Sequence, residues 1–517
     1  MPRFDNRFVR ELPGDADDSP NPRQVLGALW SNVSPTPVLA PRLLAYSREV
    51  AQLLELSDAD ISSPDWLAAL AGNQLLPGMQ TYATCYGGHQ FGSWARQLGD
   101  GRAIYLGETV NQQGQRFELQ LKGAGPTPYS RRADGRAVLR SSLREFLCSE
   151  AMHHLGVPTT RALSLVTTGE TVWRDMFYDG HPLREPGAVI CRVAPSFLRF
   201  GHFELPASRG DKALLRQLVD FTLARDFPEL QLPPAEQLRG WFAEICERTA
   251  RLIAQWMRVG FVHGVMNTDN MSILGLTIDY GPYGWIEPFD PAWTPNTTDA
   301  NGRRYCFARQ AEIARWNLER LADALSVFAA HPDELSGGLD HYDATYNQEF
   351  RRVFSAKFGL AAWRTEDAAL VEDAFACMHE LELDMTLFFR DLAQADPQSP
   401  SLTSLQNALY RPGLSPEHKA KLTEWLTRWA ARVASDNEPH ATRQTRMNAA
   451  NPRYVLRNYL AQQAIEGAEQ GDTKLLDDLL EVLRTPYTEQ AGRESFAAKR
   501  PEWARHKAGC SMLSCSS

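Results

Sequence analysis

Two side chains with oxygen ligands are spaced so that they could hold one metal ion. Asn270 stands seven residues after His263, and Asp279 follows Asn270 by nine residues in an Asp-Tyr-Gly turn. Nine residues are enough for a β-hairpin that would bring both oxygens to one ion. Mg²⁺ takes one or two such protein oxygens together with phosphate oxygens. The spacing therefore predicts a Mg²⁺ site that serves phosphate chemistry.

The elements around these residues follow the order of the metal-binding half of a protein kinase. An amphipathic helix predicted over 237–259 ends at Gly260, and a His-Gly loop, an Asn, two short strands and an Asp-aromatic-Gly turn follow it. In kinases the Asn of the catalytic loop and the Asp of the Asp-Phe-Gly turn hold Mg²⁺. The order predicts a kinase-like fold.

One position departs from the kinase pattern. Two residues after His263, where a kinase has its catalytic Asp, this chain has Val265, which cannot accept a proton. We hypothesise that Asp269 serves instead as the base or as the residue that positions an acceptor hydroxyl. Alternatively, Asp269 only caps a turn and the fold is a non-catalytic nucleotide binder.

The N-terminal half offers the lysine and glutamate that a kinase fold needs. Lys122 ends an alternating apolar run over 117–122, and Glu145 lies on the next predicted helix, 137–155. An ion pair between them would hold the lysine toward phosphate oxygens. Taken alone, the two residues are better interpreted as solvated surface charges, and only their order relative to the metal motif favours the ion pair.

Several further groups could bind phosphate. The glycine-rich loop 122–136 carries Arg131 and Arg132 next to a helix start, where backbone N–H groups can form an anion-binding nest. Arg192 and Arg199 lie further along and could grip phosphate with paired donors, or could pair with surface carboxylates. Their number suggests a triphosphate that lies differently from that of a kinase.

The chain resembles the selenoprotein-O family of pseudokinases. The resemblance spans nearly the whole chain and is carried by the strings Tyr86–Gly92, Gln97–Arg102, Leu121–Arg131, His263–Asn270, Asp279–Pro282, Asn451-Pro452 and Val455–Tyr459. It implies a protein adenylyltransferase that binds ATP in a flipped orientation and moves AMP onto Ser, Thr or Tyr hydroxyls of protein substrates, releasing pyrophosphate. A kinase that passes on the γ-phosphate and an inactive nucleotide-binding scaffold remain alternatives.

The resemblance also implies roles for individual residues. Asp269 would be the base, Glu145 would pair with Lys122, and Asn270 and Asp279 would hold Mg²⁺ or Mn²⁺. The residues that would contact the nucleotide are Gly99, Gly101, Arg102, Lys122, Asp134, Gly135, Arg192, Arg199 and Asp279. The flipped nucleotide would account for the many arginines and for Val265.

The eight cysteines fall into two groups. Five stand singly among apolar neighbours, as buried reduced thiols do: Cys85, Cys148, Cys191, Cys246 and Cys377. Cys510 and Cys515 lie in a tail of small residues, so we expect accessible thiols, although an inert frayed terminus is the alternative. The family resemblance implies a reversible Cys306–Cys515 disulfide, with Cys515 where some relatives carry selenocysteine.

Composition sets the broader limits. The 517 residues are 43% hydrophobic and 23% charged with a net charge of −9, which indicates a folded protein and argues against a dedicated nucleic-acid binder. No secretory signal and no long apolar stretch are evident. We therefore expect a cytoplasmic monomer whose partners are ATP and proteins, without a nucleic-acid or membrane partner.

The predicted elements give the architecture. Strands are expected near 103–108, 117–122, 162–166 and 188–193, with an earlier helix over 43–56. Later helices are expected at 211–226, 308–330, 366–394, 415–434, 454–469 and 473–483. The expected fold is α+β and kinase-like, with an N-terminal extension (1–80), a small β-rich N-lobe (81–195), a mainly α C-lobe (196–450) and C-terminal helices with a cysteine tail (451–517).

Overall fold

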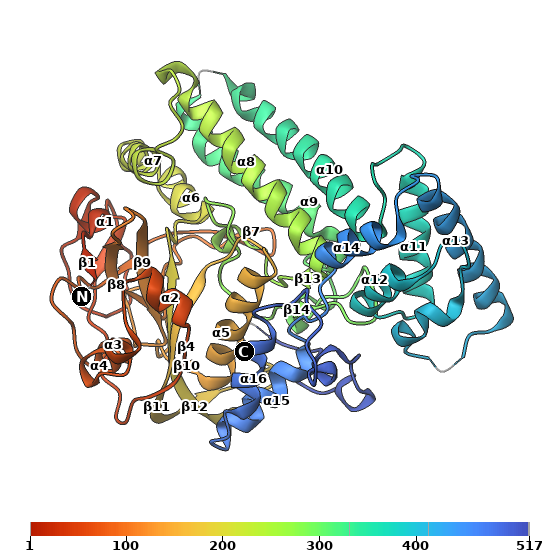
Figure 1. The fold of residues 1–517 in the computed structure, drawn as a ribbon. Helices are drawn as coiled ribbons and strands as arrows, with labels where there is room; N and C mark the ends of the chain where they lie inside the picture. Colours follow the sequence, from red (N-terminus) through yellow and green to blue (C-terminus); the bar gives the residue numbers. More distant parts are fainter. Residues whose placement is uncertain (1, 330, 412, 515–517) are drawn as a thin grey trace.

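The computed structural model describes residues 2–329, 331–411 and 413–514. A β-sheet lobe, formed by the first part of the chain, packs against a larger helical lobe formed by the rest (Figure 1). The expected α+β, kinase-like two-lobed fold is confirmed. Across the described residues, no helix is both long enough and apolar enough to cross a membrane.

Four antiparallel strands form the centre of the sheet. In spatial order they are β8 (Ala103–Val110), β9 (Arg116–Lys122), β12 (Leu183–Ala194) and β11 (Arg161–Arg174). Side chains alternate between the two faces of a strand. Leu165 and Ile190 therefore pack with helix α5 (Leu139–His154), while Val166 and Val189 pack on the other face with α2 (Arg48–Leu53) and α4 (Pro64–Leu70). Burial on both faces fixes the end of β9, where Lys122 lies.

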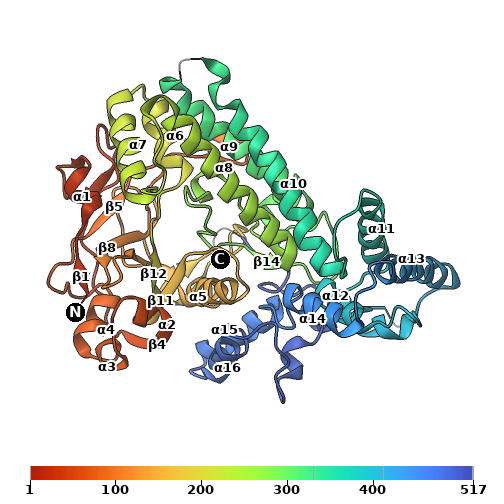
Figure 2. The same cartoon turned by 45° about the horizontal axis from the view of Figure 1, so that its top comes forward.

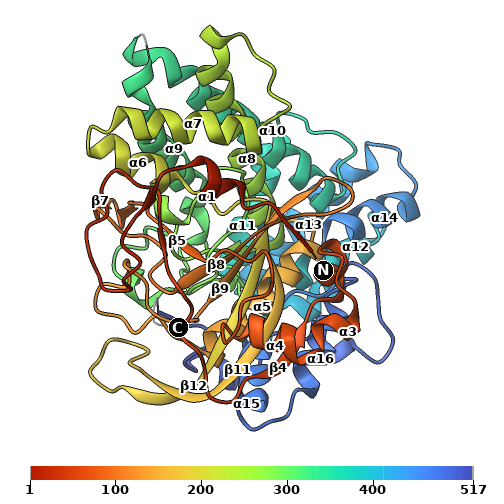
Figure 3. The same cartoon turned by 90° about the vertical axis from the view of Figure 1, so that its left-hand side faces the viewer.

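The first 80 residues complete the edges of this sheet. Strand β4 (Arg42–Tyr46) pairs with β11, β1 (Arg3–Phe4) pairs with β8, and β3 (Trp30–Asn32) pairs with β5 (Tyr82–Thr84). In Figure 3 these residues, in red, lie over the side of the sheet lobe that faces the viewer. The remaining short elements are α1 (Arg7–Glu11), β2 (Gly14–Asp15), α3 (Asp58–Ile61), β6 (His89–Gln90), β7 (Ser93–Trp94) and β10 (Ala137–Val138).

The helix expected over 43–56 is wrong in its first half. Residues 42–46 are strand β4, and the helix α2 begins only after Ser47, whose hydroxyl accepts the Val50 N–H at 3.4 Å. The open edge of β11 offers backbone partners that a local helical pattern cannot match, so pairing overrides periodicity.

The helical lobe is organised around α8 (Pro234–Val259). This helix buries one face, as its periodicity predicts, and ends at Gly260 in the left-handed conformation. Helices α9 (Gln310–Leu325) and α10 (Ser336–Phe358) lie beside it (Figure 2). The short pieces β13 (Phe261–Val262), the 3₁₀ turn η1 (Thr268–Asn270) and β14 (Gly284–Trp285) follow α8, and Asp279 lies in the loop between η1 and β14. The hairpin expected between Asn270 and Asp279 is wrong, because residues 271–278 form only isolated bridges to distant segments. The end of α8 thus sets the position of the predicted metal motif.

Most expected helices are present with small boundary shifts. They are α5, α7 (Lys212–Asp226), α9, α13 (Pro416–Ala434), α15 (Asn458–Glu469) and α16 (Lys474–Val482), and α6 (Phe200–Ser208), α10 and α14 (His440–Ala450) were not expected. The single helix expected over 366–394 is wrong, because it is divided into α11 (Asp367–Glu380) and α12 (Met385–Gln394). Glu382 adopts a left-handed φ of 50° between them, and Asp384 caps α12 by accepting the Leu387 N–H.

The C-terminal tail packs against the helical lobe. Leu513 is buried and pairs with Asn296, and its backbone N–H donates to the carbonyl of Pro295 at 2.9 Å. Cys510 is only 1% exposed, so its expected accessibility is wrong: the packed tail covers it, and burial raises its pKa to about 11. Cys515 lies outside the described residues. The cysteines among the described residues are buried free thiols.

A buried ion pair ties the C-terminal segment to the helical lobe. Arg457 donates to both carboxylate oxygens of Asp384, at 2.6 and 3.0 Å, and both side chains are at most 1% exposed. Arg457→Ala would leave the Asp384 charge buried without its partner, which costs about 3–5 kcal/mol. We predict that loss in the free energy of unfolding, measured with urea.

Arg411→Ala is the matched control. Arg411 is 59% exposed and pairs with Glu382 at the surface, so its loss should cost at most about 1 kcal/mol. Equal effects of the two substitutions would contradict this view of the C-terminal segment.

Candidate active site

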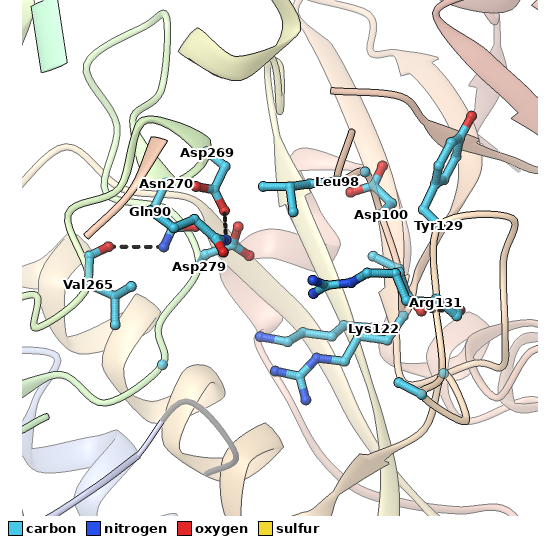
Figure 4. A pocket seen from close by; sticks show the side chains of 18 of the residues that line it. Gln90, Leu98, Asp100, Lys122, Tyr129, Arg131, Val265, Asp269, Asn270 and Asp279 are labelled. Atoms are coloured by element: carbon cyan, nitrogen blue, oxygen red, sulfur yellow. Dashed lines mark hydrogen bonds between the residues drawn. The ribbon is translucent and has the colours of Figure 1, made fainter. Parts of the chain in front are cut away.

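A cavity of about 880 Å³ lies between the two lobes. Figure 4 shows Lys122 and Arg131 on one side of it, with Asp269, Asn270 and Asp279 on the other. The cavity therefore brings together the lysine from the sheet lobe and the metal motif from the helical lobe. The predicted site residues that line it are Gly99, Gly101, Arg102, Lys122, Asp134, Gly135, Arg192, Asp269, Asn270 and Asp279.

The predicted lysine and glutamate form a buried ion pair. Lys122 Nζ lies 2.6 Å from Glu145 Oε2, and the two side chains come from the end of β9 and the middle of α5. Burial lowers the pKa of Lys122, and the Glu145 carboxylate offsets part of that change. The other oxygen of Glu145 accepts a hydrogen bond from Arg192 at 3.2 Å. Glu145 thus holds two cations at the cavity wall.

Two arginines converge on Asp279. Arg192 and Arg199 each donate to a different carboxylate oxygen of this residue. Burial alone would raise the pKa of Asp279, but Arg199, Arg192 and Lys122 hold it well below its ordinary value. Arg199 also donates to the Asp269 carbonyl at 2.9 Å and lies 4.7 Å from the ring of Tyr86. Arg199 therefore stands just behind the cavity wall, and Asp279 is ionised.

The residues of the predicted metal site suit a hard divalent cation. Asn270 donates its amide N–H to the backbone carbonyl of Val265 at 2.9 Å, which leaves its amide oxygen as the available ligand atom. Asp279 supplies an ionised carboxylate beside it on the cavity wall. Mg²⁺ and Mn²⁺ both accept such oxygens. Val265 therefore keeps a structural role through its backbone, although its side chain cannot act as a base.

Asp269 lies in η1 at the same end of the cavity. Gln90 Nε2 donates to its Oδ2 at 3.0 Å, while Oδ1 has no hydrogen-bond partner among the described residues. Gly88 packs so closely that an added Cβ would lie 2.7 Å from this oxygen. Burial raises the pKa of Asp269 to about 7, and the Gln90 hydrogen bond and the Arg199 charge counter part of that rise. The carboxyl group can therefore exchange a proton near neutral pH.

The loop after β9 forms the opposite wall. Gly135 has a φ of 70°, and a Cβ there would lie 2.1 Å from the carbonyl oxygen of Gly125, so only glycine fits this approach. Asp134 pairs with Arg174 through two hydrogen bonds of 2.9 and 2.7 Å. In contrast, Arg102, Arg131 and Arg132 line the cavity and form no ion pair within the described part of the chain. These three cations are available for an anion.

Three residues that shape the site were not identified from the sequence. Gln90 lies in a glycine-rich string to which the pattern assigned no role, and only the hairpin of β6 and β7 brings it to Asp269. Arg174 stands at the far end of β11 and gave no local signal. Asp100 is buried and accepts the Thr84 N–H at 2.8 Å, which holds the Gly99–Gly101 turn in place. Its position between two glycines was the available clue.

The Cys306 thiol does not line the cavity. It is 4% exposed at the start of a 3₁₀ turn, and burial raises its pKa. Its predicted partner in a disulfide, Cys515, lies outside the described residues.

The predicted metal site can be tested without turnover. Asp279→Ala removes the ionised ligand, so Mn²⁺ affinity in the presence of an ATP analogue should fall by at least about tenfold, as read from the free-ion EPR signal. Nucleotide affinity in EDTA should persist or tighten, since Arg192 and Arg199 lose their counter-ion.

The control is Asp290→Ala on the following segment, where the carboxylate is 40% exposed and away from the cavity. Unchanged Mn²⁺ affinity in Asp279→Ala would contradict the assigned metal site.

Comparison with solved structures gave a weak match. The chain of ROP2 from Toxoplasma gondii, described as a virulence factor with a protein-kinase fold and no enzymatic activity, is 12% identical, with 86% of this chain and 97% of that chain covered and a TM-score of 0.23. A TM-score this low means little spatial overlap, so the kinase-like architecture rests on the lobes and the element order described above.

Comparison of the sequence is far more specific. The chain is 65% identical to the protein nucleotidyltransferase YdiU of Methylobacillus flagellatus over the full length of both proteins. It is 62% identical to the protein of that name from Tolumonas auensis, over 99% of each chain. The model of the family described as protein adenylyltransferase SelO matches residues 19–484. The chain therefore belongs to the protein adenylyltransferase SelO family.

Proposed function

We propose that this protein transfers AMP from ATP to Ser, Thr or Tyr hydroxyls of protein substrates and releases pyrophosphate. Family membership makes the chain a nucleotidyltransferase. The observation that carries the rest is the position of Asp269, whose carboxyl group lies at the metal end of the cavity where Val265 has displaced the kinase base.

The proposed nucleotide is turned relative to that of a kinase. The unpaired cations Arg102, Arg131 and Arg132 lie on the glycine-turn and loop side of the cavity, so they favour a terminal phosphate placed there. The α-phosphate would then face Asp269, across from that loop. Pyrophosphate would leave toward the arginines, which are placed to stabilise its charge.

The chain's own residues support this transfer step. Asp269 would accept the proton of the acceptor hydroxyl as that oxygen attacks the α-phosphorus, and the bond to the β-phosphate oxygen would break. Lys122, fixed by Glu145, would neutralise phosphate charge. A Mg²⁺ or Mn²⁺ ion held by Asn270 and Asp279 would supply further neutralisation of the phosphates.

We further propose that the enzyme acts as a monomer in the cytoplasm. The cavity is complete within one chain, which supports a monomeric enzyme. The buried free thiols among the described residues suit a reducing compartment such as the cytoplasm.

ATP labelled separately at the α and γ positions tests the function. We expect label from the α position on protein, with pyrophosphate released. Label from the γ position would show a kinase instead, and tight binding without transfer would show an inactive scaffold.

Asp269→Asn keeps the shape of the side chain and removes its basicity. Loss of a general base costs about 10²–10⁴ in rate, so we predict a fall of that size in the rate constant for AMP transfer with nucleotide affinity little changed. Asp323→Asn, an exposed change on α9, is the control. Undiminished turnover of Asp269→Asn would refute the proposed base.

We further propose that the C-terminal tail controls the enzyme through a reversible disulfide. Pairing of Leu513 with Asn296 lays the tail beside the segment that contains Cys306, which supports a Cys306–Cys515 disulfide. Oxidised glutathione would take the two electrons, and both thiols would lose their protons.

We predict that intact-mass measurement and thiol trapping of the oxidised protein will find this bond, and that a Cys306→Ser variant will lack it. A free Cys515, or its pairing with Cys510, would contradict the prediction.

A further inference from the structure

Four arginines around the cavity mouth lack acidic partners. Within the described residues, Arg131, Arg132, Arg303 and Arg304 form no ion pair, although their neighbours Arg174 and Arg309 do, with Asp134 and Glu312. The first two line the cavity and are placed for the nucleotide phosphates. Arg303 and Arg304 do not line it, so the proposed phosphate chemistry leaves them unused.

Arg304 is held in a defined position. Its guanidinium lies 4.5 Å from the ring of Trp316 and 5.8 Å from that of Tyr305. Its backbone N–H donates to Asp299 at 2.9 Å, and the turn at Gly92 lies close enough that an added Cβ would be 3.7 Å from its Cζ. A cation stacked on aromatic rings keeps its charge while its side chain stays ordered.

One hairpin contacts both Arg304 and the proposed base, Asp269. Phe91, which precedes Gly92, lines the cavity mouth, is 40% exposed, and packs its ring 5.3 Å from that of Tyr305. Gln90, one residue earlier, holds Asp269. An acceptor that presents a hydroxyl to Asp269 must therefore lay its flanking residues over this hairpin and the segment 296–307.

The nearby carboxylates are already engaged. Asp299 accepts the backbone N–H groups of Arg304 and Tyr305, Glu312 pairs with Arg309, and Glu204 lies 2.5 Å from His89. Arg303 is exposed, so its charge faces solvent. The positive charges of Arg303, Arg304 and Arg309 outnumber the carboxylates of Asp299 and Glu312 around them, which leaves a local positive charge on the acceptor side of the site.

We propose that Arg303 and Arg304 form a docking surface that selects protein segments with Asp or Glu beside the acceptor hydroxyl. The exposed Arg303 presents paired N–H donors that match a carboxylate, whereas Nε and Nη2 of the half-buried Arg304 are covered, so Arg304 contributes its positive charge. This inference rests on the proposed AMP transfer to proteins, since it assigns the acceptor to this side of the cavity.

Peptide binding tests the surface without requiring turnover. Two fluorescent peptides would share one central hydroxyl residue and differ only in Glu or Lys flanks, and their affinity would be read by anisotropy. The protein is first loaded with Mg²⁺ and an ATP analogue whose α–β bridge cannot be cleaved. We expect the acidic peptide to bind about tenfold more tightly at low salt, with the preference shrinking as salt rises.

Charge reversal sharpens the test. In the double variant Arg303→Glu/Arg304→Glu, the preference for the acidic peptide should disappear or invert. The single change Arg303→Glu, at an exposed position, should reduce that preference by a smaller amount. Arg251→Glu is the control, because this exposed arginine pairs with Glu247 on α8. It should leave the preference intact.

The possible results separate the two proposals. Equal binding of both peptides, binding of neither, or a preference unchanged by the reversals would overturn the docking surface. Absence of α-label from every protein, including the enzyme itself, would instead overturn the proposed function.

Discussion

The site depends on one buried chain of charges. Lys122, Glu145, Arg192, Asp279 and Arg199 follow one another in contact, and they come, in that order, from β9, α5, β12, the metal loop and the N-cap of α6. Three cations and two anions leave one positive charge uncompensated in a site of low dielectric. An anion such as a triphosphate supplies what this arrangement lacks, while the ion pairs hold the two lobes in register.

The carboxyl group nearest the predicted metal ligands comes from a different position of the loop than in a kinase. Val265 stands where a kinase has its catalytic aspartate, and only its backbone contributes to the site. Its carbonyl accepts the hydrogen bond that orients Asn270. The carboxyl group moves to Asp269, which the β6–β7 hairpin of the sheet lobe reaches through Gln90. Residues from both lobes thus fix the proposed base, so its geometry depends on how the lobes are packed together.

Sequence reasoning found the features that are local or depend on order. Helix α8 and the Lys122–Glu145 pair follow from periodicity and from the sequence of elements, and their contacts agree with both. Strand β4 and the partner of Asp134 did not follow, because a sheet edge and the far end of β11 are set by pairing between distant segments. Cys510 was misjudged for the same reason: the tail is buried by segments that its own residues do not reveal.

We propose that the unbalanced charge chain and the arginines of the opposite wall fix the direction of the nucleotide. A crystal structure of the protein with Mg²⁺ and an uncleavable ATP analogue tests this directly. The account predicts the α-phosphate beside Asp269 and the terminal phosphate against Arg131 and Arg132. A terminal phosphate beside Asp269, with the adenine toward those arginines, would contradict it.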